Sequence, residues 1–415
     1  MNPSIAIIGG GPSGLLLARL LELNEIIDYV VFEKDESSML GPWLQGGTLD
    51  LHASSGQMAL KQAGLFDKFN KEFARWNASR MHILNPDGET VACFGEDDNT
   101  PEIDRVQLRQ LLLDSVPEEK IRWCHAVNAV ERRTDTEPSA KDNGCIIHFV
   151  NGTSASGFRL IVGADGTWSK VRPLLTPSAP VYSGKMFIEG KLSHDNPSYA
   201  KAKELAGPGA ILVIGKHKMI AVQQLANETY RVYFGLIVPE DFYSHRRSAM
   251  TDDLTSRTEA MRSLLLSSHD YFETYCPELK AFVTNAEGPF RSWPLHRMDP
   301  EAISWARCVA PGLTLLGDAA HATTPFVGEG VNCSMHDAVV LADYLVEHCG
   351  KDKVFSEDQA ALESALAAYE KDMFSRGEGL IRRSTQSEAT IFADDAPAQF
   401  LQFLNDAIAN KDLKR

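Results

Sequence analysis

The sequence lacks several features that mark common protein classes. Its seven cysteines are scattered, odd in number and without a close Cys-x-x-Cys pair, so neither a disulfide framework nor a zinc site is indicated. Such thiols are typical of a reducing, cytosolic compartment. The longest apolar stretch, Leu15 to Leu23, is interrupted by Arg19 and Glu22 and is too short to span a bilayer. No internal repeat or low-complexity tract is visible.

Positive charge is also scarce. The formal net charge of −15 argues against a nucleic-acid or anionic-membrane surface, although local amides and arginines can still bind an anionic cofactor. A chain of 415 residues with 44% hydrophobic content suits two domains plus a tail. The apolar run after Ser4 leaves no room for a signal peptide. We expect a soluble, cytoplasmic monomer without a metal.

A glycine fingerprint lies near the N-terminus. Ile5–Ile8 is an apolar run typical of a buried parallel strand, and Leu15–Leu21 is typical of a helix. Between them, Gly9 allows a tight turn, Gly11 lets the backbone approach a pyrophosphate, and Gly14 allows close packing of helix on strand. The free N–H groups at the helix N-terminus would hold the anion.

An acidic residue follows the next predicted strand. The apolar run Tyr29–Phe32 ends in Glu33, about 20 residues after the glycines, where a ribose-binding carboxylate is expected. A carboxylate there accepts hydrogen bonds from ribose hydroxyls and repels a 2′-phosphate. The pattern predicts FAD or NAD rather than NADP in this fold, without separating the first two.

Two further strand-and-turn segments decide between FAD and NAD. Phe158–Val162 is a predicted strand that turns at Gly163–Gly166, which contains Asp165. Leu313–Leu316 is another, and it ends in Gly317-Asp318. A carboxylate at the carboxyl end of a strand is well placed to hold a ribose hydroxyl near a pyrophosphate. Three nucleotide signals spread over one chain indicate FAD.

The segment after Asp318 ends in a predicted helix. Gly328-Glu329-Gly330 precedes it, and its N-terminus would present free N–H groups and the positive end of a dipole. Such a site stabilises the negative charge of a reduced flavin. The apolar face of this predicted helix is expected to be formed by Val331, Met335, Ala338, Ala342 and Leu345.

These motifs together resemble the FAD-dependent aromatic-hydroxylase-type (class A) monooxygenases, and most of all the tetracycline-inactivating (TetX-like) flavin monooxygenases. The likeness spans most of the chain and is weakest in residues 180–290. The segments that carry the closer likeness are Gly46–His52, Gly56-Gln57, Ala63–Leu65, Pro101–Arg105, Leu108-Arg109 and Gly317–Asn332.

The resemblance implies an α/β fold, in which a Rossmann-like (GR2-type) FAD-binding domain carries an inserted α+β substrate-binding domain and a C-terminal helix. We place the FAD-binding domain at residues 1–180 and 291–375, the substrate-binding domain at 181–290, and a C-terminal helical segment at 376–415.

The resemblance also implies specific cofactor contacts. Asp50 would approach the flavin, an arginine opening the Arg-x-x-Leu-Arg helix would contact FAD, and Pro325 would shape a turn at the ring. No catalytic side chain is expected, because the chemistry occurs at the flavin. The expected contacts to non-covalent FAD are Gly9, Gly11, Pro12, Ser13, Gly14, Glu33, Lys34, Gly47, Asp50, Arg105, Arg109, Asp165, Asp318, Pro325, Gly328, Glu329, Gly330, Val331 and Asn332.

The implied activity is hydroxylation of an aromatic or polycyclic small molecule with NADPH or NADH and O2, with a tetracycline-like polyketide as the leading substrate. Phe187 is a further candidate for an aromatic-lined pocket. The expected substrate contacts are Leu212, Tyr233, Phe234, Pro325 and Phe326.

Some residues depart from the tetracycline-inactivating pattern. No arginine occurs between Arg19 and Arg75, and Trp43 and Gln45 occupy the place of the arginine assigned to the nicotinamide donor. We therefore expect weak discrimination between NADPH and NADH. His321 is expected to be a packed, hydrogen-bonded histidine. A flavin-dependent reductase or dehydrogenase, a flavin halogenase and a non-catalytic ligand-sequestering flavoprotein are the alternatives.

Overall fold

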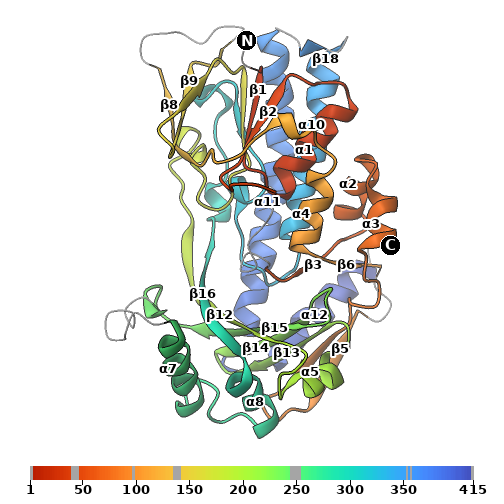
Figure 1. Cartoon of the computed structure of the whole chain (residues 1–415), viewed down its shortest axis with the longest axis vertical. Coiled ribbons are helices and arrows are strands. Elements are labelled where there is room, and N and C mark those ends of the chain that lie inside the picture. The colour runs from red at the N-terminus through yellow and green to blue at the C-terminus, as the bar shows by residue number, and fades with distance from the viewer. Residues whose placement is uncertain are drawn as a thin grey trace. The chain divides into compact units, whose positions relative to one another are not determined.

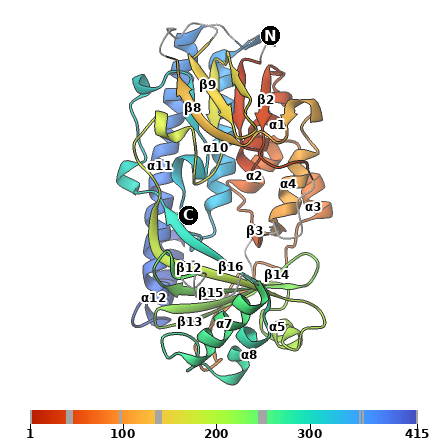
Figure 2. The ribbon, with the colours of Figure 1, turned by 60° about the vertical axis from the view of Figure 1, so that its left-hand side comes forward.

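The computed structural model describes residues 3–38, 46–95, 99–133, 142–243, 254–351, 354–355 and 358–412 (Figures 1 and 2). The chain forms two compact units. The first unit comprises Met1–Ala74, Arg105–Val181 and His296–Arg383. The second unit comprises Arg75–Asp104, Tyr182–Leu295 and Ser384–Arg415.

A five-stranded sheet forms the centre of the first unit, and all of its neighbouring strands are parallel. Four of its strands are buried along their whole length, as expected for a parallel sheet covered on both faces. The predicted strands at Ile5–Ile8 and Tyr29–Phe32 are confirmed. In sheet order, the strands are β17 (Leu313–Leu315), β11 (Leu160–Gly163), β1 (Ile5–Ile8), β2 (Tyr29–Phe32) and β7 (Ile121–Arg122).

Helices of the first unit pack around this sheet. Helix α1 (Pro12–Leu23) begins with proline, whose missing N–H costs nothing at a helix start, and five of its six leucines are buried. It packs against α10 (Gly330–Cys349) and α4 (Arg105–Leu113). The other elements of this unit are α2 (Gly56–Gln62), α3 (Phe66–Glu72), α9 (Asp318–His321), β3 (Thr48–Asp50), β8 (Val127–Arg132), β9 (Cys145–Phe149), β10 (Ser154–Ser156), β18 (Gly350–Lys351), β19 (Val354–Phe355) and four short 3-10 helices, Glu118–Lys120, Arg172–Leu174, Pro300–Ala302 and Arg307–Val309.

A seven-stranded sheet forms the second unit, and one of its faces is covered by helices (Figures 1 and 2). The pairs β12–β15, β15–β14, β14–β13 and β4–β5 are antiparallel, whereas β13 and β4 are parallel. In sheet order, the strands are β16 (Glu287–Arg297), β12 (Val181–Leu192), β15 (Tyr230–Ile237), β14 (Lys218–Gln224), β13 (Ala210–Gly215), β4 (Met81–Leu84) and β5 (Thr90–Phe94). The remaining elements are α5 (Tyr199–Ala206), α7 (Leu254–Ser267), α8 (Pro277–Asn285), α12 (Ala398–Asp412) and β6 (Glu102–Asp104).

The core of the second unit lies between this sheet and the helices α5, α7 and α8. Alternate residues of each strand reach it, so period-two patterning decides which side chains are buried. Its members include Met186 and Ile188 of β12, Val232 and Phe234 of β15, and Phe282 of α8. We call the opposite side of the sheet the second face.

The two units do not follow the expected boundaries everywhere. Residues 75–104, expected in the FAD-binding domain, belong to the second unit, because β4 pairs with β13 there. Helix α11 (Gln359–Ile391) runs without a break through the expected boundary at residue 375. Among the described residues, no helix is long and apolar enough to cross a bilayer.

Candidate functional site

Four of the sequence motifs meet at one edge of the parallel sheet. The fingerprint follows β1, Glu33 follows β2, Asp165 follows β11 and Asp318 follows β17. These strands are neighbours in the order β17-β11-β1-β2. Because the carboxyl ends of parallel strands share an edge, residues more than 150 positions apart in sequence form one site there.

The three fingerprint glycines meet different surroundings. Gly9 has φ +111°, and a Cβ there would lie 2.3 Å from the carbonyl oxygen of Ala164. A Cβ on Gly14 would lie 2.1 Å from the carbonyl oxygen of Gly9. A Cβ at Gly11 would have no neighbour within 4 Å in the part of the chain that the structure describes. Gly9 and Gly14 therefore serve internal packing, whereas Gly11 leaves open space beside the start of α1.

The Glu33 carboxylate is buried beneath the glycine turn. Its Oε2 accepts a hydrogen bond from the Gly10 amide at 2.5 Å, and its Oε1 accepts one from the Asp35 amide at 3.0 Å. Arg109 donates from Nε to the Gly10 carbonyl at 3.0 Å and from Nη2 to Asp35 at 3.0 Å. Arg109, expected as a cofactor contact, thus holds the turn and its acid in place.

Asp165 combines a satisfied oxygen with an unsatisfied one. Its Oδ2 accepts a hydrogen bond from the Lys170 amide at 2.7 Å, while its buried Oδ1 has no hydrogen-bond partner among the described residues. Burial raises the pKa of this carboxyl, and hydrogen bonds from Ser169 and Lys170 oppose that change. Oδ1 is available for a hydroxyl donor.

Asp318 begins α9 directly after Gly317. Its side chain is accessible, yet burial by the surrounding protein raises the pKa of its carboxyl against the charges of His321 and Arg105. A carboxylate that is both accessible and desolvated has protein around most of it and one open side. A Cβ on Gly317, at φ +55°, would lie 2.6 Å from the Ser334 hydroxyl oxygen.

Asn332 fastens the start of α10 to the segment around Asp50. Its Oδ1 accepts hydrogen bonds from the amides of His52 at 2.8 Å and Gly56 at 3.1 Å. Its Nδ2 donates to the Asp50 carbonyl at 2.8 Å. The Asp50 carboxylate lies 2.8 Å from Nε2 of His52. The side chain of Asn332, expected at the cofactor, is therefore occupied in joining two segments, which leaves its backbone amide for a ligand.

The other expected cofactor residues occupy varied environments. Lys34 is exposed, and Glu329 forms an ion pair with Arg383. The Gly47 carbonyl accepts a hydrogen bond from the Arg105 amide at 3.3 Å. The remaining members of the set lie in the same segments: Pro12 and Ser13 open α1, Pro325 and Phe326 lie in the loop before α10, Gly328 lies beside the Asp50 carboxylate, and Gly330 and Val331 open α10.

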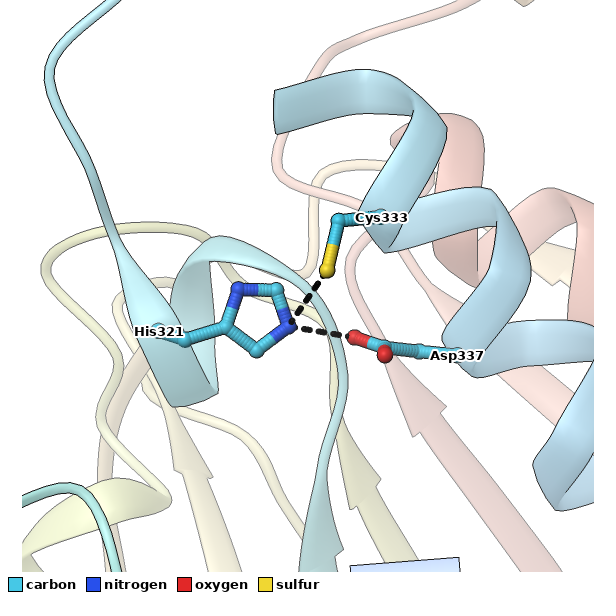
Figure 3. A group of neighbouring side chains, drawn as sticks. All are labelled: His321, Cys333 and Asp337. Carbon is cyan, nitrogen blue, oxygen red and sulfur yellow. Dashed lines mark hydrogen bonds and ion pairs between the residues drawn. The ribbon is translucent and has the colours of Figure 1, made fainter. Parts of the chain in front are cut away.

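A buried ionic cluster supports the Asp318 turn (Figure 3). Asp337 Oδ2 lies 2.6 Å from His321 Nε2 and accepts a hydrogen bond from the Gly317 amide at 2.8 Å. Arg376 of α11 donates to Asp337 Oδ1 at 2.8 Å. Asp337 therefore links the turn before Asp318 to two helices, and the expectation of a packed, hydrogen-bonded His321 is confirmed.

The contact between His321 and Asp337 shifts the pKa values of both side chains. Burial lowers the pKa of His321, but its interactions with Cys333 and Asp337 outweigh burial and hold that pKa well above its usual range. Burial raises the pKa of Asp337, but His321 and Arg376 outweigh it and lower that pKa. Both shifts favour an imidazolium paired with a carboxylate.

Three atoms of this cluster have the element types of metal ligands: Nε2 of His321, Sγ of Cys333 and an oxygen of Asp337. The 2.6 Å separation of His321 and Asp337 is that of a direct hydrogen bond, and Asp337 also faces Arg376. The adjacent guanidinium disfavours a cation. We therefore interpret the cluster as structural.

The expected substrate residues separate onto the two faces of the seven-stranded sheet. Phe187, Leu212 and Tyr233 lie on the second face, with the rings of Phe187 and Tyr233 centred 5.8 Å apart. Phe234 points the other way and is fully buried in the core with Phe290. The prediction of Phe234 as a substrate contact is therefore corrected, because adjacent strand residues face opposite sides.

The structure places three further side chains on the second face that the sequence interpretation missed. Glu189 lies directly opposite Tyr233 in the β12–β15 register. Its Oε1 lies 2.9 Å from Nη1 of Arg231, and its Oε2 accepts a hydrogen bond from the indole N–H of Trp293 at 2.7 Å. The strand pattern contained a signal, since Glu189 alternates in phase with Phe187.

The described part of the edge site fits a dinucleotide with a flavin. Open space at Gly11 lies at a helix N-terminus, as a pyrophosphate requires. The unpartnered Asp165 oxygen and the accessible Asp318 carboxylate suit hydroxyl groups. Trp43 and Gln45, at the place of the donor-binding arginine, lie outside the described residues.

Comparison with known sequences agrees with this fit. The family described as "FAD binding domain" matches residues 3–189 and 278–384. Monooxygenase penA of Penicillium thymicola is 31% identical, with 95% of this chain and 96% of that protein covered. Monooxygenase asqM of Emericella nidulans is 30% identical, with 95% and 97% covered. The 3-amino-4-hydroxybenzoate 2-monooxygenase PtnB3 of Streptomyces platensis is 27% identical, with 97% and 91% covered.

Solved structures share the fold. A single-residue variant of Klebsiella pneumoniae HpxO in complex with FAD superposes with a TM-score of 0.74 at 21% identity, covering 99% of this chain and 98% of that one. The tetracycline destructase Tet(51) superposes with a TM-score of 0.68 at 15% identity, covering 99% and 96%.

Proposed function

Because this chain belongs to the FAD-binding-domain family of FAD-dependent monooxygenases, we propose that it uses NADPH or NADH and O2 to hydroxylate a small aromatic molecule. The chemistry supplied by bound FAD is acceptance of two electrons and activation of O2, with one oxygen atom passing to the substrate and the other to water. The observation that carries the proposal is the convergence of four cofactor motifs at one sheet edge.

The residues at this edge would divide the work of binding FAD. Amides of the glycine turn and the N-terminus of α1 would bind the pyrophosphate, and Glu33 would accept hydrogen bonds from the adenosine ribose. Asp318 would hold a hydroxyl nearer the flavin. The N-terminus of α10, fixed by Asn332, would present its positive end to the pyrimidine side of the ring.

The proposed substrate is an aromatic ring that carries hydrogen-bonding groups. The aromatic side chains on the second face, Phe187 and Tyr233, suit a planar molecule. The substrate named for the relative PtnB3 is an aminohydroxybenzoate. A tetracycline-like polyketide is a second candidate class. The fold is common to Tet(51) and HpxO and does not distinguish between these classes.

Labelled oxygen tests the activity. The purified protein is incubated with NADPH or NADH, 18O2 and a panel of phenols, arylamines and tetracyclines, and products are analysed by mass spectrometry. We expect one 18O atom in a product and faster oxidation of the donor when substrate is present. Reduction of a substrate without oxygen uptake would instead identify a reductase, and binding without turnover a sequestering protein.

Replacement of Asp318 tests the cofactor site. Asp318→Ala removes a charge-assisted hydrogen bond worth about 1.5–3 kcal/mol, so FAD should bind roughly ten- to a hundredfold more weakly. Titration of the apoprotein with FAD, followed by flavin fluorescence, measures this change. Asp299→Ala, which removes an acid at a 3-10 helix of the same unit, is the control and should retain FAD. Unchanged affinity in Asp318→Ala would assign that residue to structure alone.

A further inference from the structure

Two pairs of oppositely charged side chains lie on the second face. Glu189 is only 5% exposed, and its two oxygens receive Arg231 and the Trp293 indole. Lys185, also on this face, lies 2.7 Å from the buried carboxylate of Glu388. Each carboxylate oxygen has more than one acceptor position, so Glu189 can still accept a hydrogen bond from a ligand.

These pairs are electrically balanced. Each contributes one positive and one negative charge, so a ligand in contact with them meets no net charge. A charged ligand would lose its hydration without gaining a free counter-ion, which makes its binding unfavourable. A neutral ligand avoids this cost and can still donate N–H or O–H groups to Glu189.

Aromatic side chains flank Glu189. Tyr233 lies opposite it in the sheet register and contacts the ring of Phe187. Trp293 is 47% exposed although its indole nitrogen is held by Glu189. An exposed ring fixed in orientation by a hydrogen bond offers a surface for stacking against a planar molecule.

We propose that Glu189 is the residue of the second face that recognises the substrate's polar group, and that the substrate is a neutral aromatic molecule with an N–H or O–H donor. The ring packs against Phe187, Tyr233 and Trp293, and the donor binds the Glu189 carboxylate. This inference rests on the proposed function and makes it more specific. It distinguishes this chain from a protein that selects an aromatic carboxylate.

Two matched pairs of probes test the proposal. Dissociation constants are measured by calorimetry on the FAD-loaded protein for 2-aminobenzamide and 2-aminobenzoate, and for 3-amino-2-naphthamide and 3-amino-2-naphthoate. No nicotinamide is added, so the result does not depend on turnover. At least one amide should bind, and it should bind at least about tenfold more tightly than its carboxylate partner, a difference of about 1.4 kcal/mol.

Glu189→Gln provides the decisive variant. It removes the negative charge and leaves Arg231 without its counter-ion, so the preference should reverse: the amide binds more weakly and the carboxylate more tightly. FAD content should stay the same. Glu259→Gln is the matched control, since Glu259 is an exposed acid paired with Arg262 on α7. It should leave both dissociation constants unchanged.

Arg231→Gln keeps the test decisive if Glu189→Gln does not fold. It leaves Glu189 as an uncompensated anion and should shift the preference toward the cation 2-aminobenzylamine. The proposal is overturned if neither amide binds the native protein, if the carboxylates bind it equally well, or if neither variant changes the preference. Amide binding by a protein that transfers 18O to no compound of the panel would refute the hydroxylase function but leave this recognition site standing.

Discussion

The two sheets of the molecule position functional groups in different ways. At the edge of the parallel sheet, the glycine turn with the N-terminus of α1 and three carboxylates each follow a strand end. On the second face of the seven-stranded sheet, side chains from the middle of β12, β15 and β16 meet across the strands. The first arrangement suits one cofactor shared by a family, and the second can change its ligand by substitution of single side chains.

This difference has a consequence for mutation. At the sheet edge, a substitution that disturbs the backbone, as at Gly14, affects both folding and binding. On the second face, a substitution can alter recognition while the core on the other side of the same strand is unaffected. Three pairs of variants probe this contrast.

Substitutions of two neighbouring residues of β15 should differ most in their effect on the free energy of unfolding. Phe234→Ala empties a fully buried position in the core and should lower the free energy of unfolding by about 3–5 kcal/mol. Tyr233→Ala, on the half-buried second face, should cost about 1 kcal/mol and should weaken substrate binding with FAD content unchanged. Urea unfolding of the apoproteins measures both. Equal losses of stability would mean that Tyr233 is a core residue too.

Substitutions of two fingerprint glycines should also differ in their effects on apoprotein stability and on FAD binding. Gly14→Ala forces a Cβ to within 2.1 Å of the Gly9 carbonyl oxygen and should destabilise the apoprotein by about 1–3 kcal/mol. Gly11→Ala meets open space, so apoprotein stability should change by less than about 0.5 kcal/mol. FAD should nevertheless bind at least about tenfold more weakly, because the methyl group takes the place of the pyrophosphate. Tight FAD binding by Gly11→Ala would place the pyrophosphate elsewhere.

Features of the fold and the site that are marked by adjacent residues could be predicted from the sequence, whereas features that depend on the pairing of distant strands could not. Glu33 and Asp318 were identifiable because each directly follows a short apolar strand. The Glu189–Arg231 pair was not, since it depends on a register between strands about 40 residues apart. Phe234 was misassigned although Val232 and Leu236, in phase with it, marked the core face. The parallel pairing of β4 with β13 had no local sequence signal either.

The smallest expected effect concerns pH and the His321–Asp337 pair. The folded-state pKa of His321 is raised above its unfolded value, about 6.5, so the folded protein binds the extra proton between these two values. The stability from this group is complete below about pH 6.5 and is lost as pH rises through the folded pKa, by at most about 1.4 kcal/mol per pH unit.

Urea unfolding from pH 6 to pH 9 measures this dependence. The difference in unfolding free energy between the native protein and His321→Asn should shrink as pH rises. His348→Asn removes an exposed histidine of α10. Its difference in unfolding free energy from the native protein should stay constant over the same pH range. A difference that grows with pH would mean that His321 is neutral in the folded state.

The sheet order β17-β11-β1-β2-β7 has a further consequence for biosynthesis. β1 ends at Ile8 and β17 begins at Leu313, so about 300 residues are translated between two strands of the same sheet. At ~5–20 residues per second, this takes on the order of 15–60 s. During that interval the nascent chain carries the fingerprint and Glu33 without Asp318 or α10. Full capture of the dinucleotide must therefore wait until late in translation, and hydrophobic strand edges of the unfinished sheet are exposed to chaperones until then.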